Sequence, residues 1–415
     1  MTKVTIATIV AAASGYLVLL LAARDLGATG YGVFAVFWAA YGMVTGTQNG
    51  QLQETARAVS AGAEHGAGAG RPLRVNALVG LGLAAAVAVT SPLWAPHLFP
   101  EHTWLSVGLL VAGVAGFAIY AHLAGVLSGS GRWPVFAALL CVDALIRLGA
   151  AVVATLTRWG LPAFLVITVL GTLSWILVCC CSVAAREALG LAGDVANRTL
   201  TVNTLTAMAA AAAAAVLVMG FPVLINLTRH DGDAADVRGA IILAVTLTRA
   251  PLLVPLNSFQ GVLITRFVAA HGQLGRALAV PVAALTGVAV AGAGLAWVIG
   301  PWLLTSVFGA GFELSGTALA GFTLGAGSLA VLTVTGAAAL SAHLHRWYAG
   351  GWWAATAASI LLLTIPAGQV TRVTLALVVG PLIGVAVHVA GLLQLRGVSG
   401  GAPPAAGPER DADVR

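Results

Sequence analysis

The sequence predicts an all-α membrane protein with twelve transmembrane helices in two six-helix bundles. Of the 415 residues, 59% are hydrophobic and only 8% are charged, whereas soluble domains carry about 25% charged residues. Apolar stretches of about 20 residues, the length at which a helix crosses a bilayer, follow one another along nearly the whole chain. Short sequence segments also recur half a chain apart. These three observations predict the fold class.

The apolar stretches define the expected membrane spans. The first begins at Val4, is too long for the apolar core of a signal peptide and lacks a clean cleavage site, so we expect it to be a helix. The eighth contains Arg249, Pro251 and Pro255, and prolines within a transmembrane helix often mark a bend. The expected spans are 4–23, 32–52, 75–96, 104–127, 135–157, 161–183, 203–226, 238–262, 277–299, 314–341, 348–367 and 372–395.

The basic residues predict the orientation, because cytoplasmic loops of membrane proteins are enriched in Lys and Arg. With the N-terminus in the cytoplasm, thirteen basic residues fall in cytoplasmic segments and five in outside loops. The cytoplasmic set is Lys3, Arg57, Arg71, Arg74, Arg132, Arg186, Arg198, Arg266, Arg276, Arg346, Arg396, Arg410 and Arg415. The outside set is Arg24, Arg158, Arg229, Arg238 and Arg372. We therefore expect a multi-pass protein of the cytoplasmic (plasma) membrane with both termini inside.

The two halves of the chain resemble each other. Gly32 opens the second span as Gly239 opens the eighth, at an offset of 207 residues. Similar segments follow the second and eighth spans (56–59 and 265–268) and the fourth and tenth spans (127–133 and 340–347), at offsets of 209 and about 213. We expect bundles at 1–201 and 202–396, related by a pseudo-two-fold along the membrane normal, and a disordered cytoplasmic tail at 397–415. Chance similarity among short Gly-, Ala- and Arg-rich loops is the alternative.

Several classes of function are excluded by what the chain lacks. The net charge of +6 comes without any basic block or interleaved aromatic platform, so we expect no nucleic-acid partner. Lys3 is the only lysine, which excludes a phosphate-binding P-loop. Cys141 and the adjacent Cys179, Cys180 and Cys181 lie in apolar spans and lack the spacing of a metal site. No catalytic triad or carboxylate pair can be placed in one pocket, so we expect neither an enzyme, a metal nor a cofactor.

Charged residues inside the expected spans are the first candidates for a binding site. Arg147 and Arg249 each lie deep in an apolar stretch, where an arginine costs roughly 2.5–3.5 kcal/mol on insertion scales and usually faces a cavity or a partner. Asp143 precedes Arg147 by four residues, so these two could form a structural ion pair. Arg249 has no acid within a turn. Its alternatives are a pair with Asp143 across the bundles, or capping of carbonyls freed by the nearby prolines.

Polar residues at one end of the second span form a second candidate group. Gln48, Asn49, Glu54 and Arg57 could line the mouth of a cavity, although such a strip is also typical of a helix emerging into water. Uncharged amides in the later spans are further cavity candidates, or interhelical hydrogen bonds. They are Asn203, Asn226, Asn257 and Gln260.

Three segments resemble the polysaccharide-transporter branch of the multidrug/oligosaccharidyl-lipid/polysaccharide exporter superfamily. They are 22–34 (AARDLGATGYGVF), 308–313 (FGAGFE) and Thr248-Arg249-Ala250-Pro251 followed by Gln260 and Arg266. The resemblance covers nearly the whole chain in span order, with loose motifs. It implies a V-shaped pair of six-helix bundles that alternate access and flip lipid-linked sugars. Members often carry more lysine around the cavity than this chain, so a lysine-based site is in doubt here.

The expected function is therefore a flippase that moves lipid-linked oligosaccharide or a polysaccharide precursor across the membrane. Its partners would be a polyprenyl-pyrophosphate-linked glycan, membrane lipids and enzymes of glycan assembly. Arg147 and Arg249 are candidates for the anionic head group, because a guanidinium binds phosphate oxygens in pairs. The alternatives are a cation-coupled multidrug extruder of the same superfamily, for which Asp143 is the one convincing membrane acid, and a polytopic glycosyl- or acyltransferase.

Overall fold

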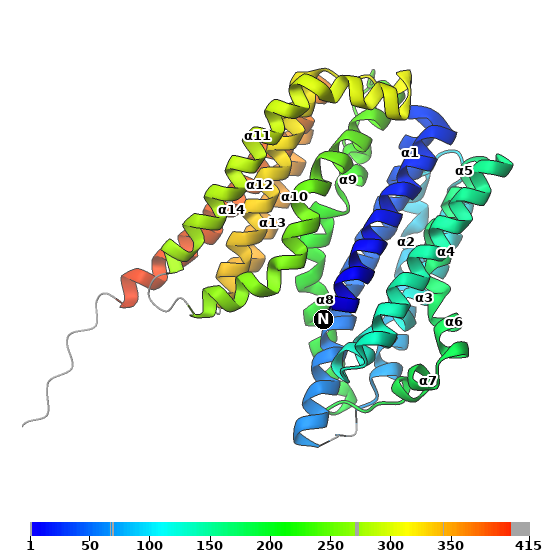
Figure 1. Ribbon diagram of the computed structural model, residues 1–415, viewed down its shortest axis with the longest axis vertical. Coiled ribbons are helices and arrows are strands. Elements are labelled where there is room, and N and C mark those ends of the chain that lie inside the picture. The colour runs from blue at the N-terminus through cyan, green and yellow to red at the C-terminus, as the bar shows by residue number, and fades with distance from the viewer. Residues whose placement is uncertain (1, 67, 69, 270–273, 343, 400–415) are drawn as a thin grey trace, which may run out of the picture.

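The computed structural model describes residues 2–66, 68, 70–269, 274–342 and 344–399, and these residues are almost entirely helical (Figure 1). In the described part of the chain, the one β-type contact is an isolated bridge between Gly70 and Gly193. The helices are α1 (Thr2–His65), α2 (Pro72–Leu98), α3 (Thr103–Gly129), α4 (Trp133–Thr157), α5 (Gly160–Leu170), η1 (Gly171–Leu173), α6 (Ser174–Cys181), α7 (Val183–Leu189), α8 (Asn197–Val218), α9 (Phe221–Leu227), α10 (Ala235–Ala269), α11 (Leu274–Phe308), η2 (Ala310–Phe312), α12 (Gly316–Ser341), α13 (His345–Leu363) and α14 (Gln369–Ser399).

These helices account for all twelve expected spans. The first two spans lie in α1, which turns at Gly27, whose φ of 65° is in the left-handed region that favours glycine. The sixth span comprises α5, η1 and α6, and the seventh comprises α8 and α9. Each of the remaining eight corresponds to one helix, α2 to α4 and α10 to α14. Nine segments of the described chain are long and apolar enough to cross a membrane, and the first of them, 62 residues long, holds two spans.

Two of the expected spans are interrupted. The seventh was expected as one helix over 203–226, but α8 ends at Val218 and α9 begins at Phe221. Pro222 explains this break, since it has no backbone N–H to continue the ladder. The sixth span tightens into a 3₁₀ turn at η1, and its last helix, α6, ends at Cys181. The side chain of the next residue, Ser182, caps α7 by accepting from the Ala185 N–H.

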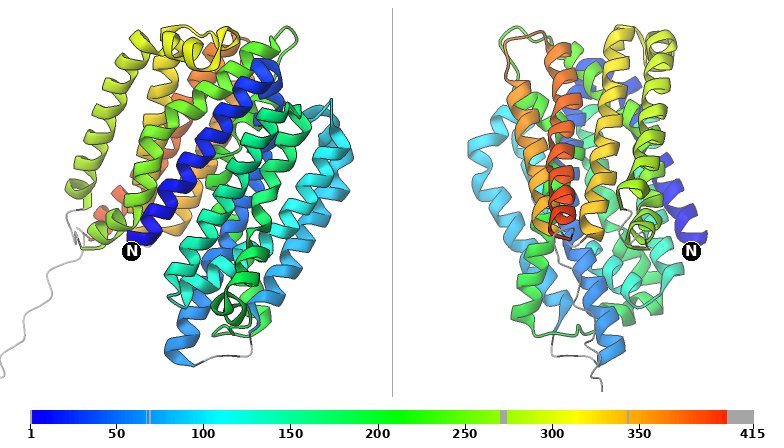
Figure 2. Two further views of the ribbon diagram at one scale, coloured as in Figure 1. Left: turned by 45° about the vertical axis from the view of Figure 1, so that its right-hand side comes forward. Right: turned by 90° about the vertical axis from the view of Figure 1, so that its left-hand side faces the viewer.

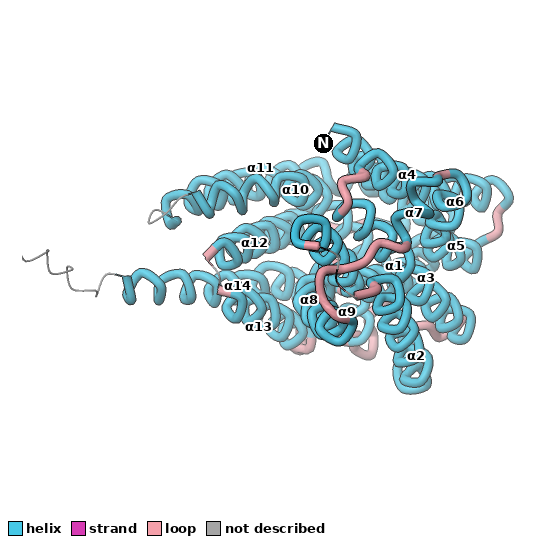
Figure 3. Tube along the Cα trace, turned by 90° about the horizontal axis from the view of Figure 1, so that it is seen from below, coloured by secondary structure: helices cyan, strands magenta, loops and turns pink. Residues whose placement is uncertain are grey.

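The helices form two groups joined by the broken seventh span. Seen from below, α2 to α7 lie on one side, α10 to α14 on the other, and α8 and α9 lie between them (Figure 3). In the second group α12 packs against α10, α11 and α14, while in the first group α1 packs against α3 and α4 (Figure 2). The protein is therefore an all-α membrane protein of two helix bundles. Of the expected tail, residues 400–415 lie outside the described residues.

Contacts between the groups gather at the end of the molecule where α11 passes into α12, the top of Figure 1. We call this the far end, and the opposite end, which carries the N-terminus and α7, the near end. At the far end the Arg24 Nε donates to the Val307 carbonyl at 2.6 Å. The ring of Tyr31 meets that of Phe312 edge-on, with centroids 5.9 Å apart. A charge-assisted hydrogen bond thus joins α1 to the end of α11, and a buried aromatic contact joins α1 to η2.

Candidate functional site

A cavity of about 200 Å³ lies between the two groups of helices. Its walls come from both halves of α1, from the break between α8 and α9, and from α10. Apolar side chains dominate the walls, and the polar or aromatic members are Tyr16, Tyr31, Trp38, Thr246 and Arg249. A mostly apolar cavity with a few convergent polar groups is the usual form of a small-molecule site.

Among the described residues, Arg249 is the one cation that lines this cavity, and it is only 8% exposed. Its Nη1 donates to the Val218 carbonyl oxygen at 2.9 Å, and its guanidinium carbon lies 5.0 Å from the centre of the Phe221 ring. Its Nε is buried without a hydrogen-bond partner among the described residues. Arg249 forms no ion pair with any described side chain. A buried guanidinium therefore faces the cavity with unused donor capacity.

The bond from Arg249 has a clear local cause. In a continuous helix the carbonyl of Val218 would accept from the N–H of residue 222, but that residue is proline. Val218 ends α8 and Phe221 begins α9, so Arg249 contacts both sides of the break. Sequence reasoning considered carbonyl capping for Arg249 with Pro251 and Pro255 as the cause. The structure assigns this capping to the carbonyl freed by Pro222 on another helix.

Tyr31 contributes a second unpartnered polar group to the cavity. The side chain is fully buried, and its hydroxyl has no hydrogen-bond partner among the described residues. Its ring is fixed by Phe34 and Phe312 at centroid distances of 6.1 and 5.9 Å. A buried polar group left without a partner costs about 1–3 kcal/mol. Tyr31 and Arg249 thus each bring a side chain with an unpartnered buried polar atom to the lining of this cavity.

Arg147 lies elsewhere and has an acid partner. Its Nη2 is 2.9 Å from a carboxylate oxygen of Asp143, one helical turn away on α4. Gly171 makes room for the pair, because a β-carbon there would lie 2.2 Å from both the Arg147 Nε and the Asp143 carboxylate. The Arg147 guanidinium also lies over the Trp38 ring, 5.8 Å from its centre. Arg147 and Asp143 do not line the cavity, but Trp38 connects them to it.

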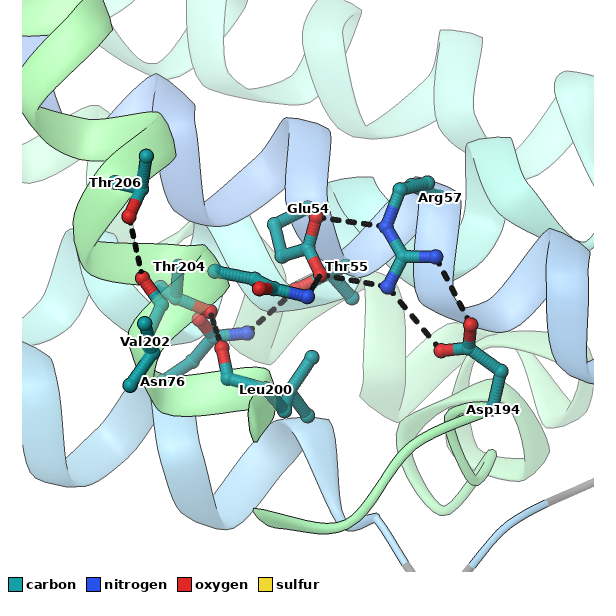
Figure 4. Close-up of polar contacts among 10 residues, drawn as sticks. Glu54, Thr55, Arg57, Asn76, Asp194, Leu200, Val202, Thr204 and Thr206 are labelled. Atoms are coloured by element: carbon teal, nitrogen blue, oxygen red, sulfur yellow. Dashed lines mark hydrogen bonds and ion pairs between the residues drawn. The ribbon is translucent and has the colours of Figure 1, made fainter. Parts of the chain in front are cut away.

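The polar strip of the second span is split between two networks. Gln48 is fully buried, and its Nε2 donates to the Val114 carbonyl at 3.0 Å and to Gln51 at 3.3 Å, whereas Asn49 is exposed. Glu54 is 7% exposed and takes two hydrogen bonds from Arg57, at 2.7 and 2.8 Å (Figure 4). None of these four predicted residues reaches the cavity.

The second network connects three segments of the chain at the near end. Arg57 bridges Glu54 on α1 to Asp194, in the segment before α8, with an Nη1 to carboxylate distance of 2.9 Å (Figure 4). The hydrogen bonds from Arg57 hold the pKa of the Asp194 carboxyl below its usual value. Asn203 on α8 donates to Glu54 at 3.2 Å. The network therefore ties α8 to the first group of helices.

Of the remaining predicted residues, Asn257 and Gln260 fall on α10, but their side chains lie outside the described residues. Asn226 is buried on α9, 8% exposed. Sequence reasoning missed Tyr16, Tyr31 and Trp38 as cavity residues, since aromatic residues in an apolar span are more often packing residues. It also missed the role of Pro222. The combination Gly220-Phe221-Pro222 was the available signal, because Gly and Pro together mark a bend.

The chain has well-matched relatives in mycobacteria. An uncharacterized protein of Mycobacterium bovis is 45% identical over 396 residues, which cover 94% of this chain and 91% of the relative. Two uncharacterized proteins of Mycobacterium tuberculosis are also 45% identical, over 396 and 395 residues with the same coverage. The chain belongs to one family with these mycobacterial proteins. No family model matches the sequence.

Solved structures with this fold include multidrug resistance MATE transporters of the MOP superfamily, the superfamily that the sequence resembles, and a lipid II flippase. The inward-facing conformation of a multidrug resistance MATE family transporter superposes with a TM-score of 0.75 at 12% identity, covering 94% of this chain and 96% of that one. The lipid II flippase MurJ, in an inward closed conformation, gives 0.68 at 12% identity, covering 95% and 88%. The outward-facing MATE conformation gives 0.63 at 12% identity, covering 97% and 96%. The predicted two-bundle fold is confirmed.

Proposed function

We propose that this protein is a flippase that moves a lipid-linked oligosaccharide or polysaccharide precursor across the cytoplasmic membrane by alternating access. The two bundles would be 1–201 and 202–396, and both termini would lie in the cytoplasm. The higher TM-score against the inward-facing conformation than against the outward-facing one, 0.75 against 0.63, supports a cavity that opens inward in this state. The MurJ neighbour, named as a lipid II flippase, supports a lipid-linked glycan as the substrate class.

The observation that carries this proposal is the uncompensated cation in the cavity between the bundles. Arg249 is buried, has no carboxylate partner among the described residues, and keeps its Nε unbonded. Arginine cannot lose its charge at physiological pH, and its planar fork matches phosphate oxygens. The pyrophosphate of a polyprenyl carrier would supply the missing negative charge, while Tyr31 would donate to a further oxygen. Arg147 is a weaker candidate for this anion, because Asp143 already neutralises it.

A multidrug extruder is the second candidate, supported by the MATE neighbours. An exporter of cations would draw its substrate with an acid in the cavity. The described residues that line this cavity include Arg249 but neither Asp nor Glu. The electrostatics of the cavity therefore favour an anionic substrate over a cationic drug.

The test is flipping of a fluorescent polyprenyl-pyrophosphate sugar by the purified protein in liposomes. Arg249→Gln should abolish flipping and leave the protein yield unchanged, because the side chain keeps a hydrogen-bond donor but loses its charge. Arg229→Gln is the matched control, since Arg229 is exposed and outside the cavity. Normal flipping by Arg249→Gln would show that Arg249 does not bind the anion. Loss of drug resistance in a deletion strain whose surface glycan is unchanged would instead favour the multidrug reading.

A further inference from the structure

We propose that a second pocket, at the near end of the first group of helices, binds the phosphodiester head group of an anionic membrane phospholipid. This pocket is separate from the cavity that contains Arg249, since the two share no described lining residue. The inference goes beyond the proposed function and does not depend on it, because it concerns a lipid that stays bound to the protein rather than one that the protein moves.

The pocket has a volume of about 710 Å³ and lies between the start of α2 and the segment that joins α7 to α8. That segment runs from α7 to α8 on the side that faces the viewer in Figure 3. Among the described residues, the polar side chains of the lining are those of Arg71 and Arg74. The apolar part of the wall includes Leu73, Ala77, Leu189 and Leu191. The pocket therefore combines positive charge with an apolar wall.

The two arginines of this pocket have no negative partner. Both are exposed, and neither forms an ion pair with a described side chain. The acids nearest to the wall in sequence are engaged elsewhere, since Glu187 lies 3.4 Å from Arg132 and Asp194 lies 2.9 Å from Arg57. The arginines are three residues apart at the start of α2, a spacing at which like charges repel. An anion bound between them would relieve this repulsion.

Hydrogen bonds to the rest of the first group fix the walls of the pocket. The Arg71 N–H donates to the Asn197 side-chain oxygen at 2.7 Å, which joins the start of α2 to the start of α8. The Nε2 of His122 lies 3.1 Å from the Leu189 carbonyl oxygen, which holds the end of α7 against α3. The isolated bridge described above joins the same two walls. A site that is formed in advance loses less conformational entropy when its ligand binds.

The position of the pocket favours a lipid over a soluble phosphate. The third span is expected to begin at Val75, so Arg71 and Arg74 lie at the level of the lipid head groups and Ala77 lies within the hydrocarbon. Guanidinium groups bind phosphate oxygens in pairs, and basic residues beside a membrane attract anionic lipids. The apolar wall suits an acyl chain, whereas a free phosphate would leave it in contact with water. The lining thus presents both chemistries of a phospholipid in the order in which the membrane presents them.

Lipid binding to the purified full-length protein in a neutral detergent tests the charged part of the site. We expect phosphatidylglycerol to bind about tenfold more tightly to the wild type than to Arg71→Gln/Arg74→Gln, as measured by native mass spectrometry, because the double variant loses both charges. Phosphatidylcholine has the same phosphodiester but no net charge, so it should bind weakly to both. Arg198→Gln is the matched control, since Arg198 is exposed at the same end and outside the described lining.

Ala77→Phe tests the apolar wall without a change of charge. Its ring would occupy the space of an acyl chain, so this variant should lose most of the phosphatidylglycerol binding although both arginines remain. Unfolding temperatures without added lipid show whether each variant is folded. Binding by folded Ala77→Phe as tight as that of the wild type would mean that surface charge alone attracts the lipid, and it would overturn the pocket.

Two other sources of phosphate are distinguished by the same measurements. If inorganic phosphate displaces phosphatidylglycerol at equal concentration, the pocket binds a soluble phosphate and the lipid proposal is wrong. If farnesyl pyrophosphate binding is lost in Arg71→Gln/Arg74→Gln but kept in Arg249→Gln, the pocket is a substrate site, and both this proposal and the anion site at Arg249 are wrong. Loss of phosphatidylglycerol in the double variant and in Ala77→Phe, with normal binding by Arg198→Gln, supports the bound lipid whether or not Arg249 binds an anion.

Discussion

Gly32 and Gly239 lie against each other at the far end, where the two bundles meet. A β-carbon on Gly32 would lie 3.3 Å from the Gly239 Cα, and one on Gly239 would lie 1.9 Å from the Ala28 carbonyl oxygen. The sequence repeat pairs the same two glycines, since each opens the second span of its half. A residue on a two-fold axis lies beside its own counterpart. The contact therefore places the pseudo-two-fold axis between α1 and α10.

We expect Gly239→Ala to weaken this junction. The added methyl group would collide with backbone, which cannot move aside as a flexible side chain can, and overpacking typically costs about 1–3 kcal/mol. Gly32→Ala should cost less, because its nearest atom is 3.3 Å away. Thermal unfolding in detergent measures both. Gly294→Ala on α11 is the control, since nothing lies within 4 Å of a β-carbon there; equal stabilities of all three variants would contradict the close contact.

The Asp143–Arg147 pair should behave as a unit in folding. Removing one partner leaves a buried charge uncompensated, which costs about 3–5 kcal/mol, so Asp143→Asn and Arg147→Ala should each lower the unfolding temperature strongly. The double variant should recover much of the loss. Flipping by the double variant then decides the role of Arg147. Normal flipping makes the pair structural, whereas a folded but inactive double variant would show that Arg147 acts on the substrate, directly or through Trp38.

Tyr31→Phe should separate stability from transport. The hydroxyl of Tyr31 has no partner among the described residues, so its removal costs no hydrogen bond and can relieve about 1–3 kcal/mol of uncompensated desolvation. We expect an unchanged or higher unfolding temperature together with slower flipping. Phe34→Leu, a change in the same aromatic cluster outside the cavity lining, should instead lower stability. Unimpaired flipping by Tyr31→Phe would exclude the hydroxyl from the site.

The ion pair between Asp194 and Arg57 predicts that the stability of the fold decreases at low pH. The native pKa of Asp194 is lowered by the hydrogen bonds from Arg57, so the pair stabilises the fold above the ordinary aspartate pKa of about 3.9 and this contribution disappears as the pH falls through the lowered value. Because Arg57 is well exposed, the effect should be no more than ~1 kcal/mol. The difference in unfolding temperature between wild type and Asp194→Asn should be constant from pH 7 to about 5 and shrink below about pH 4. Asp231→Asn, at an exposed position outside the described ion pairs, should show no such change.

The fold was predictable from the sequence because membrane spans are specified locally. A run of about 20 apolar residues must form a helix in lipid, where each backbone group has to be satisfied internally. The twelve spans and the Gly32–Gly239 relation follow from such runs and from their spacing. The two breaks were not predicted as interruptions, since Pro222 and Ser182 lie near span ends, where a proline or serine is compatible with an intact helix.

The residues of the candidate site were also predictable from the sequence only in part. The sequence alone singled out Arg249 and Arg147, because a charge within an apolar run is costly wherever the helix packs. The sequence also offered Asp143 as a partner for Arg147 and none on the same helix for Arg249; the tertiary structure shows the Asp143–Arg147 pair and gives Arg249 a carbonyl on another helix. The tertiary structure also places Glu54 and Arg57 outside the lining of the cavity and Tyr31 and Trp38 within it. Which face of a helix meets a cavity depends on how helices cross, and with apolar residues all around each span the sequence does not specify that face.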